Sequence, residues 1–254
     1  MTFTAISEKA GDRLRELVSN STLDAVGSCI DNRKYSSASD LLKSITRFIS
    51  NNPDVEYFAE ATIAKKADPV RTAEMRLQNG FNTGGKNVDM KKPPIWADLH
   101  NSTRNFRYKM HSWVMLDTLL SADEKSKDDK YLNYAINIAY DWIKNFILQE
   151  KNDEFAWYDM AVGQRATKLP YMLFRLIQNN AQKELIFHFI LACEIHIVEL
   201  SQRDRIAVHS NHGLFQIAGL IALVRSLPWL KISKDSYSIA IEVMREILIP
   251  KFLV

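Results

Sequence analysis

The chain has 254 residues, of which 46% are hydrophobic and 25% are charged, with a formal net charge of +3 at pH 7. A chain of this length and composition can bury a sizeable core, so we expect a globular protein and exclude a disordered chain. Its two cysteines, Cys29 and Cys193, are too few for a disulfide framework and lack metal-ligand spacing, so we expect no metal site.

Export and membrane signals are not recognisable in the sequence. Residues 1–11 contain Glu8 and no unbroken apolar run, which argues against a signal peptide or a lipid anchor. The longest apolar stretches, 185–200 and 214–223, are interrupted by polar residues or are too short to span a bilayer. We therefore expect a cytoplasmic protein with no membrane partner.

Apolar residues recur with helical spacing along almost the whole chain. Amphipathic segments cover residues 4–18, 37–50, 55–66, 69–78, 102–121, 129–149, 156–179, 181–202, 210–227 and 234–249. Pro170 is expected to kink or split the helix over 156–179, because proline removes an internal hydrogen bond. Short polar turns join the longer segments, which makes consecutive helices antiparallel neighbours. We predict an all-α single domain over residues 1–254, a stack of helix hairpins with almost no strand.

Residues 78–95 form the one long irregular segment, a basic loop with several glycines and lysines but no phosphate-binding fingerprint. A loop of this length is often functional, and its lysines make it a candidate lid over an anionic ligand. The wider segment 65–109 holds ten basic and four acidic residues. A surface of this sign attracts polyanions, either uronate polysaccharide or nucleic acid, but no nucleic-acid-binding signature accompanies it. The alternative is the solvated face of ordinary helices.

The run from His209 to Gly213 leads directly into the apolar helix predicted over 210–227. It places the side chains of Asn211 and His212 on the first turn, where free backbone N–H groups and the helix dipole favour an anion such as a carboxylate. The alternative is purely structural: Ser210 is a good N-cap, and its neighbours then only complete the helix start.

A second polar block runs from Ala156 to Arg165. If it binds sugar, Trp157 or Tyr158 stacks on a pyranose ring, and Arg165, with Gln164 beside it, pairs with a carboxylate. In the alternative interpretation Trp157 belongs to the core and Arg165 bridges Asp159 or another helix.

Both blocks resemble known sequences. The run Asn211-His212-Gly213, followed by Gly219-Leu220 and Leu227-Pro228, is similar to the Asn-His helix of the heparinase II/III-like and alginate lyase families of polysaccharide lyases. The block 156–165, continuing to Leu169, resembles the tryptophan-to-arginine helix that precedes it, and residues 105–120 are similar more weakly. The resemblance implies an incomplete (α/α) toroid of antiparallel helix hairpins, without the usual C-terminal β-sandwich.

The resemblance also implies a function: β-elimination on a uronic-acid-containing polysaccharide, without a cofactor. Asn211 and His212 would be the catalytic residues, and the substrate-binding residues would be Arg165, Gln164, Trp157, Tyr158 and His209. In the family, the catalytic tyrosine lies in a later segment of the sequence. We expect a missing C-terminal domain or a partner chain to supply it. Within this chain, Tyr158 and Tyr237 are the nearby tyrosines that could substitute for it. The alternative function is a non-catalytic helical module that binds acidic glycans or a protein partner. An α-solenoid adaptor is less favoured, because no fixed repeat recurs.

Overall fold

The computed structural model describes residues 13, 16–18 and 68–252. The helices expected over 37–50 and 55–66, most of the one expected over 4–18, and Cys29 lie outside the described residues.

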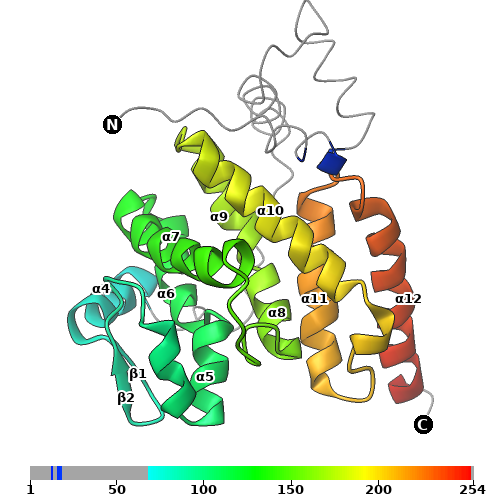
Figure 1. Ribbon diagram of the computed structural model, residues 1–254, viewed down its shortest axis with the longest axis horizontal. Coiled ribbons are helices and arrows are strands. Elements are labelled where there is room, and N and C mark those ends of the chain that lie inside the picture. The colour runs from blue at the N-terminus through cyan, green and yellow to red at the C-terminus, as the bar shows by residue number, and fades with distance from the viewer. Residues whose placement is uncertain (1–12, 14–15, 19–67, 253–254) are drawn as a thin grey trace, which may run out of the picture.

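The described part of the chain is built almost entirely of helices (Figure 1). The α-helices are α4 (Pro69–Asn79), α5 (Arg104–His111), α6 (Asp117–Ser126), α7 (Asp129–Ile143), α8 (Asp159–Ala166), α9 (Leu169–Gln178), α10 (Lys183–Leu200), α11 (Asn211–Ser226) and α12 (Ser233–Phe252). Short 3-10 helices lie at η2 (Trp96–Asn101), η3 (Val114–Leu116) and η5 (Arg203–Arg205), and η4 (Lys144–Leu148) is a π-helical turn that extends α7. The predicted all-α class is confirmed.

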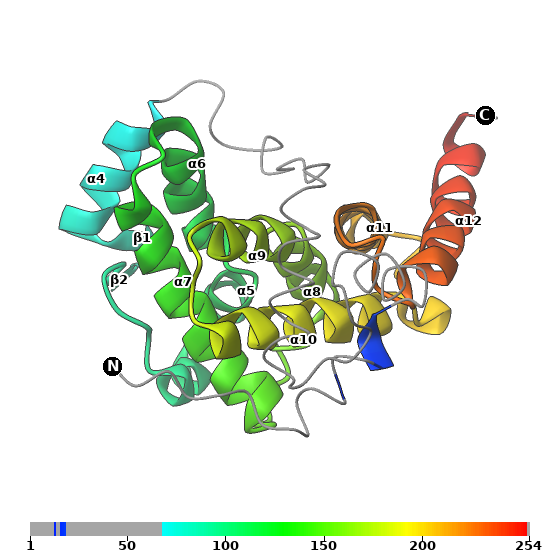
Figure 2. The ribbon, with the colours of Figure 1, turned by 90° about the horizontal axis from the view of Figure 1, so that it is seen from above.

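Consecutive long helices are joined by short connections and pack side by side, as in the helix hairpins of an (α/α) toroid. Seen from above, α10 runs across the molecule beside α9 and α11, and α12 lies at one edge (Figure 2). None of the helices in the described ranges is long and apolar enough to cross a membrane.

Side-chain caps and one proline set several helix boundaries as their residue types predict. The side chains of Asp68, Thr103, Asp128 and Ser210 accept hydrogen bonds from backbone N–H groups in the first turns of α4, α5, α7 and α11. Pro170 lies in the first turn of α9, where its missing N–H is not needed, so the helix predicted over 156–179 is split into α8 and α9.

Two predicted elements differ in the structure. The single helix expected over 102–121 is broken because Trp113 adopts a left-handed conformation, with φ of 57°, between α5 and η3. Within the loop expected over 78–95, strands β1 (Phe81–Thr83) and β2 (Lys86–Val88) pair antiparallel. Gly84 and Gly85 connect them with φ of 57° and 78°, a backbone region that glycine adopts at no steric cost.

A buried ion pair joins α6 to α9. Arg175 donates two hydrogen bonds to Asp123, from Nε to Oδ2 at 2.9 Å and from Nη2 to Oδ1 at 3.0 Å. The hydroxyl of Tyr171 donates a third, at 2.6 Å, to the same carboxylate, whose side chain is fully buried. Because a buried charge is tolerated only when it is paired and hydrogen-bonded, this cluster fixes the relative position of the two helices.

Candidate functional site

Helices α8 and α11 approach each other closely enough to exclude any side chain between them. A Cβ atom on Gly163 would lie 2.4 Å from the carbonyl oxygen of Phe215, and one on Gly219 would lie 2.3 Å from the carbonyl oxygen of Gly163. Asp159 at the start of α8 contacts His212 at the start of α11, and Gly219 meets Ala166 near the end of α8. The two helices therefore run in the same direction, and their N-termini lie together.

A carboxylate and an imidazole meet at these paired helix starts. Oδ2 of Asp159 lies 2.9 Å from Nδ1 of His212, and both side chains are partly exposed, at 27% and 30%. A carboxylate at Nδ1 keeps the proton on that nitrogen, which leaves the lone pair of Nε2 free to accept a proton or a hydrogen bond. Ser210 completes the helix start, since its Oγ accepts a hydrogen bond from the backbone N–H of His212.

Asn211 and His209 flank this pair on the surface. Both are exposed, and the side-chain amide of Asn211 makes no hydrogen bond to any residue in the described ranges. An exposed amide at the first position of a helix can donate to an anion that also meets the free backbone N–H groups.

Two tyrosines and an arginine lie beside the imidazole. The rings of Tyr158 and His212 are 5.9 Å apart in an edge-on arrangement, and the rings of Tyr158 and Tyr108 are 6.1 Å apart. Nη2 of Arg104 lies 3.3 Å from the hydroxyl oxygen of Tyr158, and its guanidinium lies over the ring at 5.5 Å. Burial raises the pKa of Tyr108, which therefore stays protonated at neutral pH. The site thus combines a cation, a phenol and an imidazole.

The structure does not bring Arg165 to this surface. Its side chain is fully buried, with Nη1 donating to the carbonyl oxygen of His111, Nη2 to that of Ala156 at 2.6 Å, and Nε to Nε2 of His196 at 3.0 Å. The guanidinium also lies 4.0 Å from the ring centre of Trp142. Burial alone lowers the pKa of Arg165. The prediction that Arg165 pairs with a substrate carboxylate is wrong, because its polar atoms face the core.

Trp157 and Gln164 are half-buried and contact neighbouring side chains. Trp157 is half-buried and packs on Trp142, with ring centres 5.7 Å apart, as the structural interpretation of its block expects. Gln164 is half-buried and hydrogen-bonds the side chain of Tyr108. It therefore supports a site residue, while its Oε1 is buried and has no hydrogen-bond partner among the described residues.

Sequence reasoning missed three contributors to the site. Asp159 was paired with Arg165 in one interpretation, whereas the structure pairs it with His212. Arg104 and Tyr108 were not singled out, because the packing of α5 against the start of α8 carries no local signal. The weak resemblance over residues 105–120 and the basic character of 65–109 were the hints that this segment belongs near the site.

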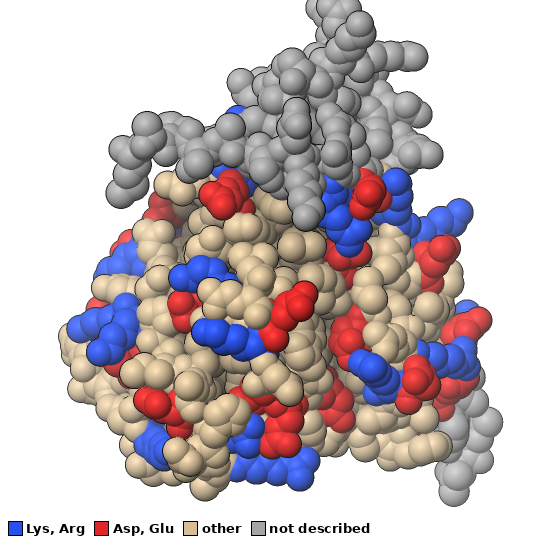
Figure 3. Space-filling view, in the orientation of Figure 1, with Lys and Arg blue, Asp and Glu red and all other residues tan. Residues whose placement is uncertain are grey.

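Of the basic segment 65–109, the structure describes residues 68–109, and acidic partners neutralise some of the basic side chains there. Arg107 pairs with Asp153 and Glu154, and Lys109 donates to Thr83. Figure 3 shows Lys and Arg interspersed with Asp and Glu over the visible face, with no large area of one sign. Arg104 is the basic residue of this segment that lies against the tyrosines of the site. No group of three metal-ligating side chains occurs among residues 13, 16–18 and 68–252.

Comparisons with known proteins agree with one another. The family model described as the heparinase II/III N-terminus matches residues 17–253. The fold is similar to a crystal structure of heparan sulfate lyase HepC from Pedobacter heparinus, with a TM-score of 0.73 and 19% identity, over 94% of this chain and 39% of that one. It is also similar to a heparinase III gene product, with a TM-score of 0.70 and 16% identity, over 92% of this chain and 40% of that one. The chain therefore spans about two fifths of the length of these structures. No curated protein matches the sequence significantly.

Proposed function

The chain belongs to the heparinase II/III N-terminal family, and from that premise we propose that it supplies the helical half of a polysaccharide lyase site that acts by β-elimination. The substrate class is a uronate-containing acidic polysaccharide. The observation that carries the proposal is the group formed by exposed Asn211 and partly exposed His212 and Tyr158 at the paired starts of α8 and α11. The similar solved structures support the proposal, because one is described as a heparan sulfate lyase and the other as a heparinase III gene product.

Asn211 is assigned to the uronate carboxylate. Neutralising that carboxylate acidifies the proton on the neighbouring ring carbon, and a hydrogen bond aimed at the charge that grows in the transition state is worth about 3 kcal/mol. The backbone N–H groups of the first turn of α11 and the dipole of that helix favour the same anion. The positive charge of Arg104 also attracts the carboxylate. The negative charge of Asp159 repels it less, because that side chain is hydrogen-bonded to His212.

His212 is assigned to proton transfer or to neutralisation of the carboxylate, and Asp159 to its orientation. A carboxylate that fixes Nδ1–H leaves Nε2 as the basic atom, which is the form that a general base requires. Tyr158 is offered as the phenol nearest to the imidazole, and Arg104 orients its hydroxyl. His209 is a flanking substrate contact.

The site residues are tested by binding and turnover together. We expect acidic uronate oligosaccharides to bind and neutral ones to bind more weakly at this surface. The affinity for the acidic ones should fall as salt rises, because exposed charges are screened beyond about 8 Å at physiological ionic strength. In a form of the protein that turns over, Asn211→Ala should lower kcat by about a hundredfold while changing substrate binding less. Ultraviolet absorbance of the unsaturated uronate product measures the rate.

Asn133→Ala is the matched control, since Asn133 is exposed on α7. Equal binding of acidic and neutral oligosaccharides, or an undiminished rate for Asn211→Ala, would overturn the assignment. Salt-sensitive binding of acidic glycans with no turnover under any condition would favour a non-catalytic glycan-binding module, the second candidate function.

A further inference from the structure

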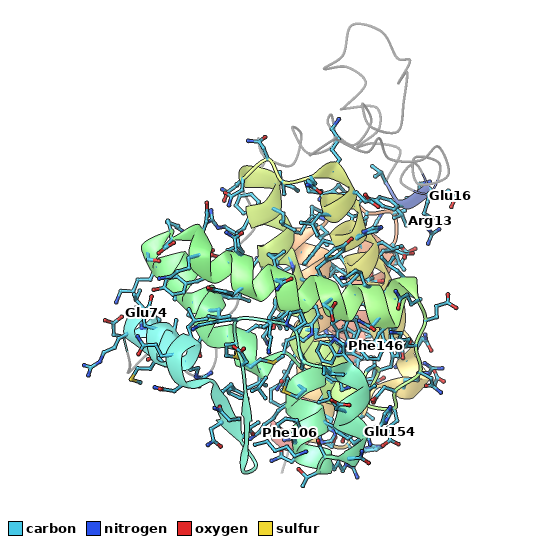
Figure 4. All side chains as sticks on the ribbon, turned by 60° about the vertical axis from the view of Figure 1, so that its left-hand side comes forward. Arg13, Glu16, Glu74, Phe106, Phe146 and Glu154 are labelled. Carbon is cyan, nitrogen blue, oxygen red and sulfur yellow. The ribbon has the colours of Figure 1, made fainter. Side chains whose placement is uncertain are left out.

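A cavity of about 290 Å³ lies apart from the group around His212. Trp96 and Phe146 form its apolar wall, Ile95 lies at its exposed rim, and Asp141 and Asp153 supply carboxylates. Figure 4 shows Phe146 in the interior of the view and Glu154, the neighbour of Asp153 in sequence, at the lower edge. Such a combination of apolar wall and few polar groups is typical of a small-molecule site.

One carboxylate oxygen in this cavity has no hydrogen-bond partner. The side chain of Asp153 is 2% exposed. Its Oδ1 accepts hydrogen bonds from Nη2 of Arg107 at 3.1 Å and from the backbone N–H of Phe155 at 2.8 Å. Its Oδ2 has no partner among the described residues, and Nδ1 of His100 is 3.7 Å away. A buried acceptor of this kind is costly unless a ligand donates to it.

A second unpartnered polar atom lies next to this carboxylate. Nε1 of Trp142 donates to Nδ1 of His111 at 3.1 Å, so the proton of this buried imidazole is on Nε2. That Nε2–H group lies 3.6 Å from Oδ1 of Asp153, too far for a hydrogen bond, and has no partner in the described ranges. Asp153 lines the cavity, so a buried oxygen without a donor lies in its wall, with the Nε2–H group of His111 beside the same carboxylate.

The charges around the cavity select against ionic ligands. Asp153 is already paired with Arg107, and Asp141 is paired with Lys144 at 3.2 Å and accepts a hydrogen bond from Nε1 of Trp96. A cation would find no uncompensated carboxylate here, and an anion next to Asp153 would meet its oxygen that lacks a donor, while Lys151 in the lining donates to Oδ1 of Asn145. A neutral hydroxyl group donates to that oxygen without adding a charge.

We propose that this cavity binds one neutral pyranose unit, through a hydroxyl hydrogen bond to Asp153 and packing of the ring on the wall of Trp96 and Phe146. Asp153 and Tyr158 belong to the same connecting segment between η4 and α8, so the cavity is a neighbour of the site around His212. The assignment goes beyond the proposed function and does not depend on Asn211.

Ligand-observed saturation-transfer NMR on the full chain tests the proposal. The neutral probes are glucose, galactose and N-acetylglucosamine, and the charged comparators are glucuronate and methylguanidinium. We expect saturation transfer to at least one neutral probe, with a dissociation constant on the order of a few millimolar for so small a ligand. We also expect weaker binding of both charged comparators.

Two variants locate the binding. Ala97→Trp places a large ring at the exposed rim, and Asp153→Asn removes the acceptor; each should weaken binding of the neutral probe by about tenfold or more. Asp98→Ala, at an exposed residue of the same short helix, and Asn211→Ala should leave it within about twofold. If circular dichroism shows that Asp153→Asn unfolds the protein, Ala97→Trp alone decides.

Any one of several outcomes would overturn the proposal. They are no transfer to any neutral probe, binding that survives Ala97→Trp, and tighter binding of glucuronate or methylguanidinium in a manner that Ala97→Trp abolishes. Loss of neutral binding with Asn211→Ala would instead move the ligand to the site around His212, and so would also refute it. None of these outcomes alters the test of Asn211 with acidic oligosaccharides.

Discussion

Gly219→Ala is the sharpest test of how α8 and α11 present the site. The new Cβ would lie 2.3 Å from the carbonyl oxygen of Gly163 and 2.9 Å from the Cβ of Ala166. Both distances are too short for real contacts, and a backbone oxygen cannot swing away as a side chain can. Overpacking of this kind costs about 3 kcal/mol at the upper end of its usual range. Alanine returns about 1 kcal/mol through its better helix propensity. We therefore expect a net loss of about 2 kcal/mol.

Urea and thermal unfolding measure that loss. For a chain of this size, a change of 2 kcal/mol in the free energy of unfolding lowers Tm by roughly 4–8 °C. Ala218→Ser, at an exposed position of the same helix, is the control and should cost only about 0.5 kcal/mol. A Gly219→Ala variant as stable as the unmodified chain, or more stable, would show that the added Cβ costs nothing in packing and that only the better helix propensity of alanine acts. The close approach of the two helices would then be refuted, and with it the support for Asp159 beside His212.

Three further predictions concern the buried and exposed histidines and their partners. Arg165→Met should lower the free energy of unfolding by about 3 kcal/mol or more, because three buried acceptors lose their donors; an unchanged urea midpoint would contradict the buried cluster. Burial lowers the pKa of His111 to about 3 and that of His196 well below its usual 6.5. The unfolded chain takes up these protons first, so stability is complete above pH 6.5 and falls below it by up to about 1.4 kcal/mol per pH unit for each histidine. Urea unfolding at pH 7 and 5.5 checks this, and equal stabilities would count against neutral buried imidazoles. Asp159→Ala should shift the neutral imidazole of His212 away from the Nδ1–H tautomer, as read from ¹⁵N NMR; a tautomer that does not respond would show that the carboxylate does not set it.

The sequence predicted the helical elements well wherever their boundaries are local. Side-chain caps and Pro170 act within one turn of the residues they affect, so the starts of α4, α9 and α11 follow from the residue types. The break at Trp113 could not be predicted, because a fully buried tryptophan holds a left-handed backbone only when tertiary packing requires it.

The candidate site was predicted in part, and the misses share one cause. Asn211, His212 and Tyr158 were identified because they lie in short polar blocks beside apolar helices. The ionic partner of His212 and the burial of Arg165 depend on contacts between segments far apart in sequence. A residue type that binds anions at a surface also satisfies backbone carbonyls in a core, so Arg165 could not be assigned from its neighbours alone.

The pairing of Asp159 with His212 joins residues 53 positions apart in the chain, with α9 and α10 between them. Closing a loop of that length has an entropic cost that only the docking of the intervening hairpin offsets. We therefore expect the pair to form late in refolding, after α9 and α10 have packed. A peptide that contains only one of the two helix starts would lack the pair. During refolding, the tautomer of the His212 imidazole would therefore report when the chain has finished folding.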